Sequence, residues 1–194
     1  GSTEENRLEL KKGLPGVPVF AIKSNRGYSG GANAGLREIF KRGAERAFFL
    51  TNDTELRTGA IERCSDLAKR HSAHMVAPKI VKRNRPDAVD SIGGRFDPDT
   101  ARLQHVREPG RPLRLEEPDY IPGTAFWIHR DVFEALGGFD ESYHTYWEDV
   151  DFSMRAHRAG FTLLRCEDSV ALHGVGQTCH KNALYTTFYF QRNR

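Results

Sequence analysis

The stretch VPVFAIKSNRGYSGGANAGLREIFKRGAERAFFLT, residues 17–51, decides the fold class. VPVFAI (17–22) is a short, continuous apolar run and predicts a buried strand. ANAGLREIFKRGA (32–44) gathers its apolar side chains on one helical face and predicts a helix. RAFFLT (46–51) predicts the next strand. The order strand, helix, strand is typical of an α/β domain.

The same alternation continues on the C-terminal side of this stretch. Residues 56–72 predict a helix and residues 74–81 a third strand. This rhythm predicts an α/β fold with a mixed, mostly parallel sheet and right-handed crossovers. The remaining expected elements are short strands around SIGGRF (91–96) and ARLQHV (101–106), a strand over 120–129 interrupted by Pro122 and Gly123, helices over 130–140 and 148–160, strands over 161–166 and 169–176, and an amphipathic helix over 182–194.

Composition excludes several classes of protein. The chain has 194 residues, 38% hydrophobic and 28% charged, which suits one soluble domain over 1–194. A net charge of +3 is too small to indicate nucleic-acid binding, and no apolar run reaches the ~20 residues of a membrane span. The polar start shows no signal peptide, and Cys64, Cys166 and Cys179 lack a disulfide or zinc spacing. We therefore expect a cytoplasmic protein.

Two polar motifs follow predicted strands directly, where open α/β sheets bind ligands. SNRGYSGGANAG (24–35) could bring its backbone close to a phosphate, or it could simply be a glycine turn that begins a helix. In LTNDTEL (50–56), Asp53 could hold Mg²⁺ or Mn²⁺, or Asp53 and Thr54 could only cap the next helix.

A third motif, YWEDVDFSMR (146–155), places three acids within four residues. Glu148 and Asp151 are i,i+3 neighbours on one helical face, and all three acids lie in a first turn that favours anions. Asp149 beside a cation or phosphate could also act as a general base. His173, in an apolar strand, is either a further ligand or a satisfied core residue.

Together these motifs resemble the family 2 glycosyltransferases, which have the GT-A fold, and within them the bacterial enzymes of polysaccharide synthesis, rhamnosyltransferases included. The resemblance covers nearly the whole chain and rests on six segments in order: NRGYSGGANAG (25–35), LTNDT (50–54), PGTAFWIHRDVFEALGGFDE (122–141), YWEDVDFSMR (146–155), AGF (159–161) and ALHG (171–174).

The resemblance implies inverting transfer of a sugar from a nucleotide-diphosphate sugar to a saccharide or lipid-linked acceptor. It implies Asp149 as the base that deprotonates the acceptor hydroxyl, with Glu148 and Asp151 orienting the acceptor or neighbouring groups. It also implies Asp53 and His173 as ligands of Mg²⁺ or Mn²⁺, which would neutralise the leaving diphosphate.

The remaining implied residues belong to the donor pocket. Asn25, Gly27 and Asn33 would line the nucleotide, Gly123 and Thr124 would form the floor, and Trp147 would stack on a sugar face.

Two features depart from the family pattern. The leading position of the D-x-D metal motif is Thr51, so only Asp53 offers a carboxylate. The opening β-α-β portion of the family is also missing, and Gly1-Ser2-Thr3 is either the tail of such a loop or an expression-tag scar. We therefore expect one GT-A domain that is incomplete at its N-terminus.

These departures keep a second hypothesis open, in which the chain is a catalytically silent fragment or a degenerate relative that only binds. An unpaired sheet edge would favour homo-oligomers, and peripheral association of the full-length protein with the inner face of the membrane is a further expectation. A dinucleotide-binding oxidoreductase is disfavoured, because no GxGxxG is followed by an acid ~20 residues later.

Overall fold

The computed structural model describes residues 4–117, 119–174 and 183–194 of the chain. Gly1-Ser2-Thr3, Cys179 and the end of the expected strand over 169–176 lie outside these residues. The helices and strands are α1 (Glu4–Gly13), α2 (Gly27–Lys41), β1 (Arg46–Leu50), β2 (Thr54–Leu56), α3 (Ala60–His71), β3 (Met75–Lys82), β4 (Arg85–Ser91), β5 (Gly94–Asp97), β6 (Arg102–His105), β7 (Arg114–Leu115), β8 (Asp119–Tyr120), β9 (Ala125–His129), α4 (Arg130–Leu136), a 3₁₀ turn (Glu141–Tyr143), α5 (Glu148–Arg158), β10 (Leu163–His173) and α6 (Ala183–Asn193).

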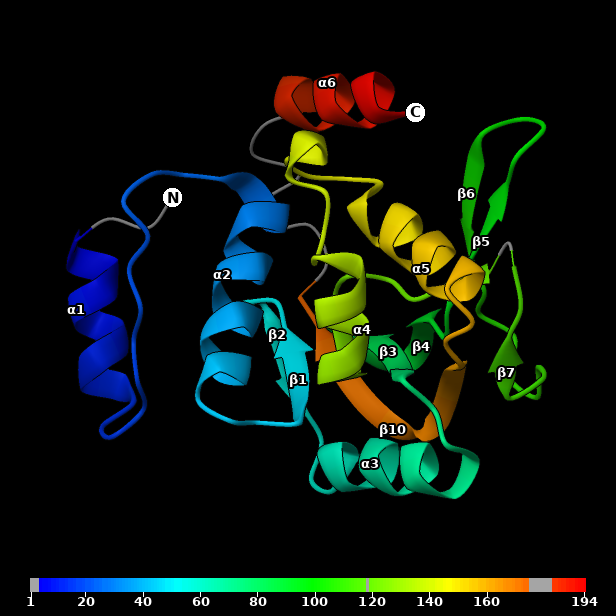
Figure 1. Cartoon of the computed structure of the whole chain (residues 1–194), viewed down its shortest axis with the longest axis horizontal. Helices are drawn as coiled ribbons and strands as arrows, with labels where there is room; N and C mark the ends of the chain where they lie inside the picture. Colours follow the sequence, from blue (N-terminus) through cyan, green and yellow to red (C-terminus); the bar gives the residue numbers. More distant parts are fainter. Residues whose placement is uncertain (1–3, 118, 175–182) are drawn as a thin grey trace.

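A mixed sheet forms the centre of the molecule (Figure 1). Its strand order is β1-β9-β3-β10-β2, with β4 beside β3 and β7 beside β10. The register of β1 on β9 pairs Leu50 with Ala125, which brings the end of β1 next to the start of β9. The end of β10 pairs with β2, His173 opposite Thr54. Three chain segments distant in sequence therefore meet at one end of the sheet.

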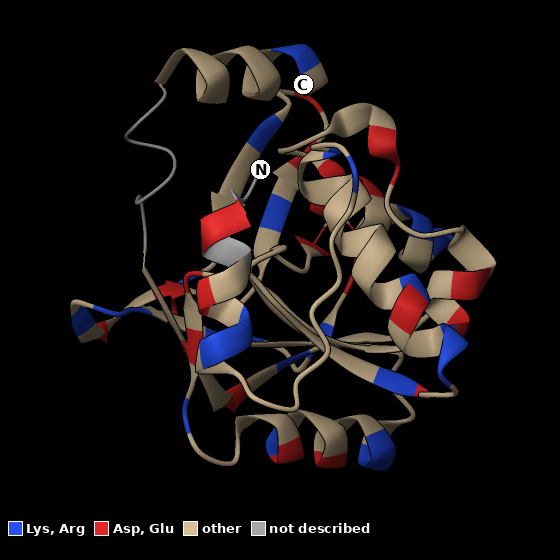
Figure 2. Cartoon of the chain, turned by 90° about the vertical axis from the view of Figure 1, so that its left-hand side faces the viewer, with Lys and Arg blue, Asp and Glu red and all other residues tan. Residues whose placement is uncertain are grey.

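Helices cover both faces of this sheet, and the alternation of strand side chains explains how. Met75, Phe126 and Leu163 face a core shared with α2, α4 and α5. Their chain neighbours Val76, Trp127 and Leu164 face the opposite way, into a core shared with α3. The outer side of α3 carries acidic and basic residues together, as expected of a solvated helix face (Figure 2).

Two further elements flank the first turn of α5. A small antiparallel sheet, β6-β5-β8, stands beside α5, and α6 lies across the loop that precedes it (Figure 1). The side-chain amide of Asn193 donates to the carbonyls of Tyr143, Thr145 and Tyr146 at 2.7, 2.8 and 2.9 Å. The C-terminal helix therefore holds the segment that leads into the acidic motif.

The structure confirms the α/β fold and most expected elements, and it corrects three. VPVFAI (17–22) is no strand: it pairs with no strand among the described residues, and Val17, Phe20 and Ile22 are exposed. An apolar run supplies hydrophobicity, but a strand also needs a neighbour for its backbone hydrogen bonds. Phe20 instead packs under the guanidinium of Arg42, 4.7 Å from the ring centroid, beside the end of α2.

The expected parallel character of the sheet is the second correction, because only the β3–β10 pairing is parallel among the described pairs. The third is that the strands expected over 161–166 and 169–176 form one strand, β10, with a bulge between Cys166 and Val170. Among the residues that the structure describes, no helix is both long and apolar enough to cross a membrane.

Candidate functional site

A pocket of about 390 Å³ lies at the end of the sheet where β1, β9 and β10 meet. Its size falls within the ~300–1,000 Å³ range of small-molecule sites. Most of its lining residues are polar, and they come from six parts of the chain: Asn25, Gly27, Tyr28, Thr51, Asn52, Asp53, Gly123, Thr124, Thr145, Tyr146, Glu148, Asp149, His173, Tyr185 and Thr186.

Asp53 and His173 meet on one side of this pocket. His173 Nε2 lies 3.5 Å from Asp53 Oδ2, and His173 Nδ1 lies 3.6 Å from Asp90 Oδ2. Thr51 Oγ1 donates to Asp53 Oδ1 at 2.8 Å, so the residue at the leading D-x-D position orients the carboxylate. The backbone carbonyl of Asp53 accepts from Arg83 and Gly174, which fixes the loop after β1.

Asp149 lies on the other side, in the first turn of α5. Its Oδ2 accepts from the backbone N–H of Gly123 at 2.9 Å, and its Oδ1 accepts from that of Val150 at 2.9 Å. The Tyr28 hydroxyl donates to the carbonyl of Gly123 at 2.5 Å. Burial raises the pKa of Asp149, which makes the carboxylate more basic than an exposed aspartate. These contacts fix the Asp149 carboxylate at the pocket wall, where it makes no ion pair with any of the described residues.

Glu148 is the more deeply buried member of the acidic pair, at 5% exposure. Burial first, and the charge of Asp149 second, raise the pKa of Glu148 to about 8. The buried site therefore favours the protonated form of this carboxyl. Its Oε2 is buried without a hydrogen-bond partner among the described residues, although the pocket lining includes it. An unpartnered buried carboxyl beside a pocket is available to a ligand hydroxyl.

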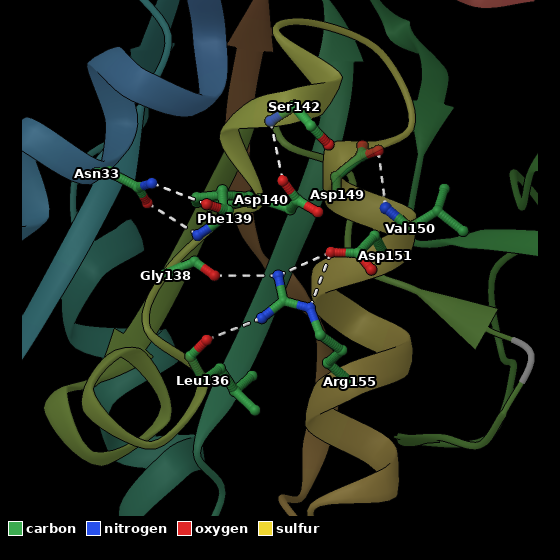
Figure 3. A network of polar contacts seen from close by, with 10 residues as sticks. All are labelled: Asn33, Leu136, Gly138, Phe139, Asp140, Ser142, Asp149, Val150, Asp151 and Arg155. Carbon is green, nitrogen blue, oxygen red and sulfur yellow. Dashed lines mark hydrogen bonds and ion pairs between the residues drawn. The ribbon is translucent and has the colours of Figure 1, made fainter. Parts of the chain in front are cut away.

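Asp151 does not line the pocket. It pairs with Arg155 one turn later, 2.7 Å between Oδ2 and a guanidinium nitrogen, and Arg155 also donates to the carbonyls of Leu136 and Gly138 (Figure 3). Arg155, paired with Asp151, thus ties α5 to the end of α4 and the turn after it. Its predicted role near the acceptor has no support in this geometry.

Asn33 also makes its hydrogen bonds away from the pocket. At 2% exposure, its amide donates to the Phe139 carbonyl at 2.8 Å and accepts from the Phe139 N–H at 2.8 Å (Figure 3). This bidentate pairing fixes the loop after α4 to α2, and Asn33 is not among the lining residues. The other predicted residues of that glycine motif, Asn25 and Gly27, do line the pocket.

Asn25 and Gly27 form the turn that begins α2. Asn25 Oδ1 accepts from the Gly27 N–H at 3.0 Å. Gly27 has φ +69°, and a β-carbon on it would lie 2.2 Å from the His144 carbonyl, so only glycine fits. Opposite this turn, the carbonyl of Thr124 accepts from the Thr51 N–H at 3.0 Å and closes the pocket floor.

Trp147 occupies a different position from the one expected. It is 6% exposed and does not line this pocket; its indole N–H donates to the Phe190 carbonyl at 3.0 Å. It lines an adjacent cavity on the far side of Glu148 and Asp149. The sequence motif placed an aromatic residue beside the acids but could not say on which side of them it lies.

Sequence reasoning missed several lining residues. Tyr28 lies inside the glycine motif, yet its role depends on Gly123, 95 residues away. Tyr185 and Thr186 come from α6, whose apolar pattern indicated only an amphipathic helix. Asp90 lies behind His173 and does not line the pocket. No sequence motif pointed to it, because its position beside His173 depends on the β3–β4 pairing.

Comparison with known proteins decides the family. Residues 1–137 match the family described as Glycosyl transferase family 2. The chain belongs to this family. The match covers the glycine motif, the segment with Asp53 and the Gly123–Thr124 floor, and the acidic motif follows it directly.

Curated relatives of this glycosyltransferase chain include a "Low-salt glycan biosynthesis hexosyltransferase Agl10" of Haloferax volcanii, 27% identical over 177 residues, covering 88% of this chain and 56% of the relative. A "dTDP-rhamnosyl transferase RfbF" of Shigella flexneri is 22% identical, covering 82% and 53%. An "N-acetylglucosaminyl-diphospho-decaprenol L-rhamnosyltransferase" of Mycobacterium tuberculosis is 23% identical, covering 89% and 64%. The chain thus spans about half to two thirds of these relatives.

Solved glycosyltransferases share the fold. GalNAc-T7, in a structure with UDP, GalNAc and Mn²⁺, superposes with a TM-score of 0.67 at 17% identity, covering 88% of this chain and 34% of that chain. The mannosyltransferase PcManGT of Pyrobaculum calidifontis, in complex with GDP-Man and Mn²⁺, gives 0.61 at 16% identity, covering 99% and 52%. The predicted GT-A fold is therefore confirmed.

Proposed function

We propose that this chain is the catalytic domain of an inverting glycosyltransferase that moves a sugar from a nucleotide-diphosphate sugar to a saccharide or lipid-linked acceptor in cell-surface polysaccharide synthesis. The observation that carries the proposal is the arrangement of Asp149, held by the Gly123 N–H at 2.9 Å, across one pocket from Asp53 and His173. Family membership and the relatives' transferase names support it.

The proposed reaction is a single displacement. Asp149 accepts the proton of an acceptor hydroxyl, whose oxygen forms a bond to the anomeric carbon of the donor sugar. The bond from that carbon to the diphosphate oxygen breaks, and the nucleoside diphosphate leaves with the electron pair. Attack from the face opposite the leaving group inverts the anomeric carbon.

Asp53 and His173 have the donor atoms for a hard or borderline divalent cation. A carboxylate oxygen and an imidazole nitrogen suit Mg²⁺ or Mn²⁺, and a carboxylate behind the second ring nitrogen, as Asp90 provides, is typical of metal-binding histidines. Neutralising charge on the diphosphate is the chemistry that such a cation supplies. Within the described ranges, no cluster of three or more His, Cys, Asp or Glu side chains could hold a metal ion, so the diphosphate itself would complete the coordination.

The second candidate function is binding without turnover. Thr51 at the leading D-x-D position favours it, because one carboxylate is then missing from the pocket. Thr51 nevertheless donates to Asp53, which keeps the remaining carboxylate in place.

Calorimetry with UDP, dTDP and GDP, each with and without Mn²⁺, tests the donor site. We expect one nucleotide to bind in a Mn²⁺-dependent way and Asp53→Asn to abolish that dependence, with the exposed Asp66→Asn on α3 as the matched control. Incubation of the chain with the matching nucleotide-sugars and saccharide acceptors then separates the candidates. Nucleotide binding without transfer would favour the silent domain, and failure of all three nucleotides to bind would contradict the donor site.

A further inference from the structure

A second cavity of about 600 Å³ adjoins the pocket described above. The two share Tyr146, Glu148, Asp149 and Thr186. The rest of its lining comes from β6 and the residues after it, from β8, from the residue before α5, and from α6: Leu103, Gln104, His105, Arg107, Tyr120, Trp147 and Phe190. Asp149 thus stands between two cavities, of which only the first contains Asp53 and His173.

One part of this second cavity is an aromatic wall. Trp147 contacts Phe96 edge to face, 5.8 Å between centroids, and its indole N–H is fixed on the Phe190 carbonyl. Tyr120 is 2% exposed, and its ring lies where a β-carbon on Gly94 would be. Rigid aromatic faces beside polar groups are suited to the apolar faces of sugar rings.

The other part is basic. Neighbouring arginines of this region are neutralised locally: Arg95 by Asp119, Arg111 by Glu108 and Arg114 by Glu116. Arg107 is exposed and makes no ion pair within the described residues, although it lines the cavity. His105, on β6, adds a ring nitrogen that can donate a hydrogen bond. An arginine with free donors is suited to an anionic oxygen group.

Of the acidic pair, Glu148 adds little negative charge of its own to this cavity. Burial, and then the charge of Asp149, raise the pKa of Glu148 to about 8, which favours the neutral carboxyl near pH 7. Its Oε2 is buried and has no partner in the part of the chain that the structure describes. A ligand hydroxyl in the second cavity could supply the missing hydrogen bond, which makes the Glu148–Asp149 pair the meeting point of the two cavities.

We infer that the second cavity is the acceptor site and that it takes a saccharide carrying an anionic group, phosphate or carboxylate, bound by Arg107 and His105. The inference rests on the proposed transferase function, since Asp149 can take a proton from a hydroxyl in this cavity while a donor occupies the other. Trp147 then contacts the acceptor rather than the donor sugar.

Titration of ¹⁵N-labelled chain with three probes tests the site: glucose 1-phosphate, glucuronate and uncharged methyl glucoside. The indole N–H signals of Trp147 and Trp127 serve as reporters, because Trp147 lines the cavity and Trp127 lies in the sheet. We expect an anionic probe to shift the Trp147 signal alone. Arg107→Gln should weaken that binding about tenfold, and Arg107→Lys should retain most of it.

Arg102→Gln is the matched control, because Arg102 is an exposed arginine on β6, the strand just before Arg107, and does not line the cavity. A response to glucose 1-phosphate alone assigns a phosphate, and a response to glucuronate alone assigns a carboxylate. Equal binding of methyl glucoside, equal effects of the Arg107 and Arg102 variants, or no response to any probe overturns the inference. Nucleotide calorimetry on the same variants reports on the donor site separately, so failure of the proposed function would appear there.

Discussion

The backbone N–H of Gly123 donates to Asp149 across 26 residues of sequence, joining the segment before β9 to the first turn of α5. The same glycine accepts from the Tyr28 hydroxyl. A β-carbon at Gly123 would lie 2.6 Å from that hydroxyl oxygen, so the close approach depends on glycine. One glycine residue, through its N–H and its carbonyl, therefore contacts both the proposed base and the wall of the donor pocket.

Asp149→Asn should abolish transfer and keep the fold. An asparagine oxygen can still accept from the Gly123 N–H, but the amide cannot take a proton from the acceptor. The rate should fall by about 10²–10⁴, while Mn²⁺-dependent nucleotide affinity stays near the wild-type value. Steady-state kinetics with calorimetry checks both, and full activity in this variant would remove Asp149 as the base.

Arg155→Met should lower stability rather than remove chemistry. The change leaves Asp151 without its cation and the Leu136 and Gly138 carbonyls without their donor. We expect a loss of about 2–4 kcal/mol in the free energy of unfolding, measured by urea denaturation. Asp151→Asn should lose less and retain activity per folded molecule. A selective loss of kcat in Asp151→Asn, with normal stability, would restore a catalytic role for Asp151.

Asn193→Ala should loosen the segment before the acidic motif. His144, Tyr146 and Trp147 all have positive φ, at 61°, 65° and 75°, and the Asn193 amide holds carbonyls of this strained segment. Misplacement of Asp149 should reduce kcat by up to about 10²-fold and leave nucleotide affinity little changed. Gln191→Ala, exposed on the same helix, is the control, and equal kcat in both variants would exclude a positioning role for Asn193.

Glu148 should make stability depend on pH. Its folded pKa of about 8 lies above the ordinary value of 4.5, so its contribution to stability is complete below about pH 4.5 and is lost as pH rises through 8. Glu148→Gln should flatten the fall in unfolding free energy between these values, measured by denaturant titration across pH. An identical pH dependence in both proteins would show that Glu148 ionises freely.

Sequence patterns were sufficient to predict the helices and strands that depend mainly on interactions between neighbouring residues. The helical period over α3 and α5 and the apolar runs of β3 and β9, the latter beginning after Pro122 and Gly123, gave elements that the structure confirms. VPVFAI (17–22) misled because a strand needs a partner, which no local pattern can reveal. For the same reason the sequence predicted two strands where β10 is one. Pairing with β3 continues on both sides of the bulge in β10, and a local pattern does not show this.

By itself the sequence determined the fold class and the segments that could carry chemistry, because turn residues, hydrophobic period and motif spacing are properties of neighbouring residues. Its motifs also carried the resemblance to the family that the comparison then showed. Only the tertiary structure decided how those residues are used. It turned Asp151 toward Arg155 and Asn33 toward Phe139, moved Trp147 to the second cavity, and added Tyr28 and Asp90. The reason is that a side chain's direction depends on partners contributed by distant strands and helices, which become neighbours only once the sheet has formed.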